Sequence, residues 1–117
     1  MLMNDENELL EKGISSSPSA KSNLTLDQAV EFGEYDPKAL SNFAQWHTLS
    51  SHIQWQLIRK ALDIRHRQLI TQYAELNNAL DLSKKPHIRE AMRSVEKQLS
   101  KLTEDKEELY VEYSNKI

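Results

Sequence analysis

Two long helical patterns meet at a short break, the segment Asp81-Leu-Ser-Lys-Lys-Pro86. After the break, apolar side chains recur at alternating intervals of four and three residues, with Lys106 as the interruption. These side chains are Ile88, Met92, Val95, Leu99, Leu102, Leu109 and Tyr113. Such a heptad seam is narrow and suits one partner helix, and Pro86 fits the first turn of a helix. We therefore predict an antiparallel, coiled-coil-like hairpin of two helices, at about residues 51–80 and 86–114.

The pattern before the break carries more apolar surface than one neighbouring helix covers. Its main stripe is Ile58, Leu62, His66, Leu69, Tyr73, Leu76 and Leu80. A second apolar arc is formed by Ile53, Leu57, Ala61 and Ile64. Together the two arcs span about 220° of the helix surface at about 100° per residue. This half of the helix is therefore expected to pack also on the N-terminal region, on another copy of the chain, or on a different protein.

Two short helices are predicted ahead of the hairpin. Thr25 and Gln28 have the spacing of a capping box, and Gly33 suits the end of the helix that follows. Asp36 and Pro37 are a typical N-cap and first position for the next helix. The buried face of that second helix is expected to include Leu40, Phe43, Ala44 and Trp46. The predicted fold is all-α, with one or two short helices packed at the open end of the hairpin.

Residues 1–23 differ in composition from the rest of the chain. They are acidic and rich in Ser, with few apolar side chains to bury. We therefore expect residues 1–23 to form a flexible arm, and residues 24–117 to form the helical hairpin domain. A chain of 117 residues has room for one domain of this kind.

Aromatic residues gather at one end of the predicted hairpin. Antiparallel pairing brings the start of the first long helix beside the end of the second. The predicted aromatic end consists of Phe43, Trp46, Trp55, Tyr110 and Tyr113. Two interpretations remain open for it, because Trp and Tyr dominate protein interfaces but also fill small cores.

Basic residues gather at the opposite end, near the turn. The predicted basic patch is Lys84, Lys85, Arg89, Arg93, Lys97 and Lys101. Residues 59–101 carry a net charge of +5, between segments of −5 (residues 1–58) and −3 (residues 102–117). Such a patch suits contact with phosphates or with an acidic protein surface. The alternatives are a solvated face with Glu90 and Glu96 as local counter-charges, or a face covered by an acidic segment of this chain or of a second copy.

No catalytic, cofactor-binding or metal-binding residues are identified. The chain has no Cys and only two Gly, which leaves no thiolate chemistry and no glycine-rich phosphate loop. The four His lack the spacing of a helical metal site, and His66 is expected to be a partly buried residue of the apolar stripe. No small-molecule substrate is indicated. Apolar runs are too short to span a membrane, and a cytoplasmic location, or one within a virion or other assembly, is expected rather than secretion.

These patterns favour a non-enzymatic structural or interaction protein. We expect a small helical hairpin subunit that oligomerises or docks on a larger assembly, such as a scaffold, an assembly factor or a virion component. The alternative is a nucleic-acid-associated regulator that binds phosphates through the basic patch. The net charge of −3 and the acidic ends weaken that alternative.

Overall fold

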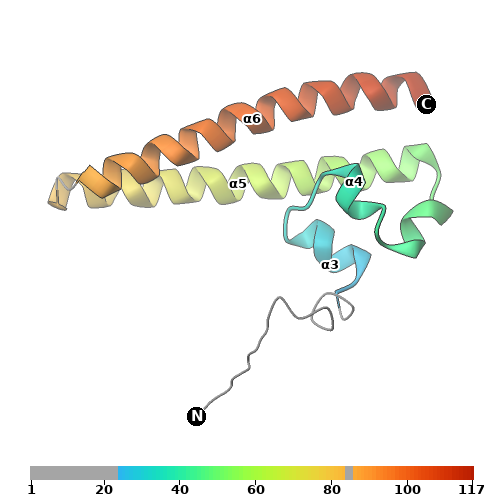
Figure 1. Ribbon diagram of the computed structural model, residues 1–117, viewed down its shortest axis with the longest axis horizontal. Helices are drawn as coiled ribbons and strands as arrows, with labels where there is room; N and C mark the ends of the chain where they lie inside the picture. Colours follow the sequence, from blue (N-terminus) through green and yellow to red (C-terminus); the bar gives the residue numbers. More distant parts are fainter. Residues whose placement is uncertain (1–23, 84–85) are drawn as a thin grey trace, which may run out of the picture.

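A computed structural model describes residues 24–83 and 86–117 of the chain (Figure 1). The described residues form helices and turns, with no strand among them. The helices are α3 (Leu26–Glu31), α4 (Pro37–Leu40), the 3-10 helix η1 (Ala44–Thr48), α5 (Ser51–Ser83) and α6 (Pro86–Lys116). Helices α5 and α6 pack side by side and antiparallel, which confirms the predicted hairpin. The arm predicted at residues 1–23 lies outside the described residues.

The long helices begin where the sequence predicts. The hydroxyl oxygen of Ser50 accepts a hydrogen bond from the backbone N–H of Ile53 at 3.2 Å, as the side chain of an N-cap residue does. Pro86 is the first residue of α6, where its missing N–H costs no helical hydrogen bond. The predicted seam of α6 faces inward, with its buried residues spaced as a heptad pattern requires: Val95, Leu102, Leu109 and Tyr113.

The seam of α5 differs from the prediction at one position. Ile58, Leu62 and Leu69 are buried as expected, but His66 is exposed, so its predicted partial burial is wrong. At about 100° per residue, His66 lies about 60° from the line through those three residues, whereas Arg65 lies about 40° away on the other side. Arg65 is accordingly half-buried beside residues 24–50, the N-terminal segment of the described chain.

The segment before α5 winds over one face of the hairpin (Figure 1). Helix α3 begins with the predicted capping box, in which Gln28 N–H donates to the Thr25 hydroxyl at 3.1 Å and Thr25 N–H donates to the Gln28 side chain at 3.0 Å. Gly33 follows with a φ of 90°, a conformation that suits glycine. Asp36 then caps α4 through the backbone N–H of Lys38 at 3.0 Å.

The second short helix is not continuous to Trp46, so that part of the prediction is wrong. Helix α4 ends at Leu40, where the Ser41 hydroxyl donates to the Lys38 carbonyl at 2.7 Å. A local bond of this kind competes with continuation of the helix. Phe43 is extended (φ −95°, ψ 125°), and η1 starts after it. This change of direction buries Trp46 and leaves Ala44 exposed, contrary to its expected burial.

The core lies between the hairpin and these short segments. Leu40, Ile58 and Ala61 have no exposed surface, and Val30 has almost none. At the rim of the core, the Lys60 ammonium and the Glu31 carboxylate form an ion pair at 2.7 Å between α5 and α3. One face of the hairpin is therefore covered by the chain's own N-terminal segment.

Candidate functional site

Three of the five residues of the predicted aromatic end meet in the structure. Trp55 stacks on Tyr113 with ring centroids 5.7 Å apart and planes at 15°, and meets Tyr110 edge-on at 6.2 Å. The Lys116 ammonium lies 4.6 Å from the centre of the Tyr113 ring, which makes a cation–π contact. Burial divides the group: Trp46 and Tyr113 belong to the core and Phe43 packs against it, whereas Tyr110 keeps 62% of its surface exposed. Tyr110 is thus the member of this group that is most available to another molecule.

The second apolar arc of α5 lies mainly under the chain's own segments. Ala61 is fully buried, Leu57 packs against the core and Ile64 is half-buried, while Ile53 keeps 39% of its surface exposed. Helix α3 packs on this part of α5. Of the three coverings considered for the arc, the N-terminal region is the one that the structure places there.

The basic patch is solvent-exposed and partly neutralised within its own helix. Arg93 pairs with Glu90 at 3.1 Å, and Lys101 pairs with Asp105 at 3.1 Å. Arg89 and Lys97 are also exposed on α6. Lys84 and Lys85 lie outside the described residues. Because two of its four described cations pair with neighbouring carboxylates, the described part of this patch fits a solvated and partly balanced face.

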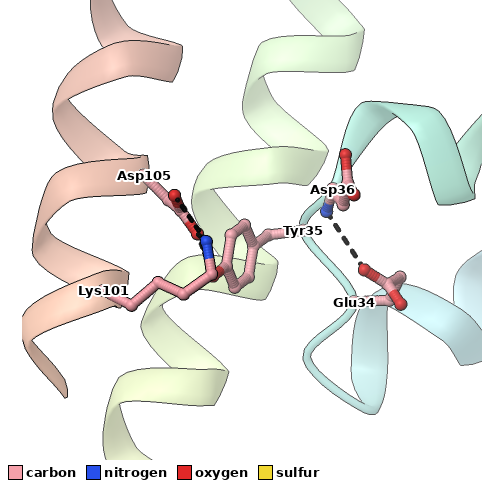
Figure 2. Close-up of polar contacts among 5 residues, drawn as sticks. All are labelled: Glu34, Tyr35, Asp36, Lys101 and Asp105. Carbon is pink, nitrogen blue, oxygen red and sulfur yellow. Dashed lines mark hydrogen bonds and ion pairs between the residues drawn. The ribbon is translucent and has the colours of Figure 1, made fainter. Parts of the chain in front are cut away.

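A polar latch ties the N-terminal segment to α6 (Figure 2). The Tyr35 hydroxyl donates to the Asp105 carboxylate at 2.7 Å, and the Lys101 ammonium contacts both oxygens of the same carboxylate at 3.1 and 3.2 Å. Beside it, the backbone N–H of Asp36 donates to the Glu34 carboxylate at 3.1 Å. The loop between α3 and α4 thus reaches across α5 to bind α6.

The same loop is anchored on α5. The Arg65 guanidinium donates from Nε to the Gly33 carbonyl at 3.4 Å, and the Gln68 amide donates to the Phe32 carbonyl at 3.3 Å. The pKa of Tyr35 is raised well above its usual range. Burial of the ring is the largest cause, and the hydrogen bond to Asp105 is the next largest. A polar cleft of about 620 Å³ remains between this loop, α5 and α6. The polar groups that line the cleft bond mainly to one another, so these contacts explain how the loop is held in place.

The opposite face of the hairpin carries an open groove between α5 and α6. Its volume is about 830 Å³. The residues that line it are Trp55, Arg59, Leu62, Asp63, Thr103, Lys106, Glu107, Tyr110 and Val111. Tyr110 and Val111 are 62% and 59% exposed, and such exposure is unusual for large apolar side chains that neighbour each other. None of the short N-terminal helices contributes a residue to the lining of this groove.

Four charged residues stand around these apolar side chains. Arg59 and Asp63 project from α5, and Lys106 and Glu107 from α6. All four are exposed, and none forms an ion pair with another residue in the part of the chain that the structure describes. The groove therefore combines apolar side chains with two cations and two anions that have no ion-pair partner among the described residues.

Sequence reasoning found the aromatic end but missed the groove and the latch. Lys106 was the available signal for the groove, because it interrupts the seam of α6 next to Tyr110 and Val111. The spacing of Lys101 and Asp105, four residues apart on one helix, could indicate their ion pair. Nothing in the sequence indicates that Tyr35, distant in the chain, would bind the same carboxylate.

Comparison with known proteins adds no family or relative: no protein-family model, no curated protein and no solved structure matches the chain. Within residues 24–83 and 86–117, no three His, Cys, Asp or Glu side chains are grouped so as to hold a metal ion. In the same ranges, no helix is both long and apolar enough to cross a membrane. The groove combines two adjoining exposed apolar side chains with charged side chains that have no ion-pair partner among the described residues.

Proposed function

We propose that the protein is a structural or interaction subunit, whose α5–α6 hairpin docks on another protein surface, in an oligomer or a larger assembly. The observation that carries the proposal is the groove that contains Trp55, Tyr110 and Val111. Exposed apolar side chains that adjoin one another, within a polar rim, are typical of protein interaction sites. Trp and Tyr are also the residue types that contribute most to binding energy in such sites.

The division of the hairpin into two faces supports this proposal. The N-terminal segment stabilises α5 and α6 on one face, so that the hairpin is held in shape before it meets a partner. A rigid, preformed surface loses little conformational entropy on binding. An amphipathic helix, or a pair of helices, has the shape that a groove between two helices accepts.

Site-specific photo-crosslinking in the cells that make the protein tests the proposal. A photo-reactive amino acid at Val111 is expected to yield one discrete crosslinked species, because this position lies in the groove. The matched control is the same amino acid at Arg67, which is also exposed on the hairpin but does not line the groove. Absence of a product at Val111, or equal products at both positions, would overturn the proposal.

A further inference from the structure

We propose that a second copy of this chain occupies the groove, forming a dimer whose central part is a four-helix bundle. This inference rests on the proposed function and names the partner. In the arrangement we infer, the twofold axis runs parallel to the hairpin, and α5 of each copy lies antiparallel on α6 of the other. The open ends of the two hairpins then lie together, and so do their turns.

Charge complementarity identifies the occupant. The rim of the groove holds two cations and two anions, and the structure gives none of them an ion-pair partner among the described residues. A twofold interface places the same surface against itself, so each charge must meet an opposite charge from the same set. A rim of balanced and unpaired charges satisfies this condition, whereas a rim of one sign would repel a second copy.

The register of the hairpin decides which charges meet. Trp55 lies level with Tyr113, and the Tyr73 hydroxyl donates to Glu96 at 3.0 Å further along. Because the helices are antiparallel, later residues of α5 lie beside earlier residues of α6. Measured along the long axis of the hairpin, Lys106 and Glu107 therefore lie between Arg59 and Asp63. Rotation about a twofold axis parallel to the hairpin leaves the position of each residue along that axis unchanged.

Two ion pairs per copy follow from this register. Each Arg59 comes within about one helical turn of Glu107 of the second copy, and each Asp63 comes within the same range of Lys106. The long side chains of Arg59 and Lys106 can span an offset of this size along the hairpin axis. Lys106 would then gain a counter-charge at the place where it interrupts the apolar seam of α6.

The position of the apolar side chains distinguishes a twofold axis parallel to the hairpin from one that runs across it. Trp55, Tyr110 and Val111 all lie near the open end of the hairpin. An axis parallel to the hairpin brings the two apolar patches together and removes both from water. An axis across the middle of the hairpin, which is the transverse arrangement that also pairs the hairpins over their full length, would set each apolar patch against the basic turn of the other copy and leave both patches exposed.

A pair of complementary charge reversals tests the dimer with the full chain. Native mass spectrometry is expected to find a dimer for the unmodified chain. Arg59→Glu or Glu107→Arg alone creates two like-charge contacts across the twofold axis, and each is expected to weaken self-association by about tenfold or more. Arg67→Glu, an exposed reversal outside the groove, is the matched control and is expected to leave the dimer unchanged.

Mixing the two variants gives the decisive result. In a heterodimer of the Arg59→Glu chain with the Glu107→Arg chain, both contacts regain opposite charges. The heterodimer is therefore expected to exceed the half share that random pairing gives. Because this recovery requires two different chains, repair of a contact within one chain cannot produce it. Circular dichroism of each variant checks that the helices are retained.

The outcomes separate this inference from the proposed function. A monomer at about 100 µM, a concentration that detects even weak pairing, would overturn the dimer, and so would random pairing in the mixture. If the chain is monomeric but the crosslinker at Val111 captures a product with the mass of another protein, the second copy is the wrong occupant and the docking function stands. If neither dimer nor crosslink forms, both proposals fail.

Discussion

The two faces of the α5–α6 hairpin have similar helices but different surroundings. On one face, the segment that contains α3, α4 and η1 covers most of the second apolar arc of α5, and the polar latch between Tyr35 and Asp105 fixes this segment in place. On the other face, Trp55, Tyr110 and Val111 line an open groove. The covered face explains how a hairpin of this size is stabilised within one chain, and the open face shows where adjoining apolar side chains remain exposed.

The difference between the covered and the open face shows that a wide apolar surface on a helix does not by itself identify an interaction surface. The width of the apolar surface on α5 suggests a need for more than one neighbour, and the chain's own N-terminal segment meets most of that need. Phe32 and Ile70 are exposed singly, whereas two adjoining exposed apolar side chains, Tyr110 and Val111, lie on α6 outside its heptad seam. An interaction surface is therefore identified by what the folded chain leaves uncovered.

The largest contrast between the faces is expected from truncating one apolar side chain on each. Leu40→Ala removes a fully buried side chain from the covered face and should lower the free energy of unfolding by about 2–5 kcal/mol. Val111→Ala on the open face should change it by no more than about 0.5 kcal/mol. Urea unfolding, at a protein concentration low enough to keep the chain monomeric, measures both. Equal losses would contradict the division into a covered and an open face.

A second contrast concerns the backbone of the loop on the covered face. Gly33 has a φ of 90°, and a Cβ there would lie 3.3 Å from both Arg65 Nε and Gln68 Oε1. Gly33→Ala is therefore expected to destabilise the fold by about 1–2 kcal/mol. Arg59→Ala on the open face, where the side chain has no ion-pair partner among the described residues, serves as the control and should be nearly neutral. Thermal unfolding followed by circular dichroism compares them, and a neutral Gly33→Ala would show that the loop is not held as described.

A third contrast removes one hydroxyl group from each face. Tyr35→Phe deletes the hydrogen bond to Asp105 and is expected to cost about 1 kcal/mol. The cost is less than for a fully buried bond because Tyr35 is partly exposed. Tyr110→Phe is the matched control, because the Tyr110 hydroxyl forms no hydrogen bond with the described residues. Chemical unfolding of both variants gives the comparison, and a loss for Tyr110→Phe equal to that for Tyr35→Phe would contradict the role of the latch.

The smallest effect is a dependence of the latch on alkaline pH. The pKa of Tyr35 is raised in the folded state, so the folded chain retains the phenolic proton at a pH where the unfolded chain loses it. The stability from this group is thus fully present below about pH 10, the usual pKa of tyrosine, and falls as the pH rises further. Measured in urea at pH 8 and pH 11, the advantage of the natural chain over Tyr35→Phe should shrink at the higher pH. An advantage that grows would contradict the assigned cause.

Local signals predicted the helices well because each depends on neighbouring residues. The capping box at Thr25, the N-cap at Asp36 and the heptad seam of α6 each depend on residues close together in the sequence, and all occur as predicted. The local bond between Ser41 and Lys38 ends α4, but the division between α4 and η1 was missed because the burial of Trp46 in the core also contributes to the path of the chain beyond Leu40. The exposure of His66 was missed for a similar reason, since the position of α6 determines which residue of α5 faces inward.

The candidate interaction surface was predicted less well, because it depends on which parts of the hairpin the residues before α5 cover. Sequence periodicity placed Trp55 near Tyr110, and the structure has them in contact. Trp46 on its expected buried face and Tyr113 in the heptad seam are both buried as predicted, but periodicity did not show that Tyr110 would keep most of its surface exposed. That division arises from the path of residues 33–50 over one face, which depends on contacts such as that between Tyr35 and Asp105.

Oxidative footprinting of two side chains at increasing protein concentration tests the central claim most directly. Tyr110 on the open face and Phe32 on the covered side are almost equally exposed, at 62% and 63%. We expect oxidation of Tyr110 to fall as the concentration passes through the dimerisation range, while oxidation of Phe32 stays constant. Constant oxidation of Tyr110, or a fall confined to Phe32, would contradict the assignment of the groove as the surface that a second copy covers.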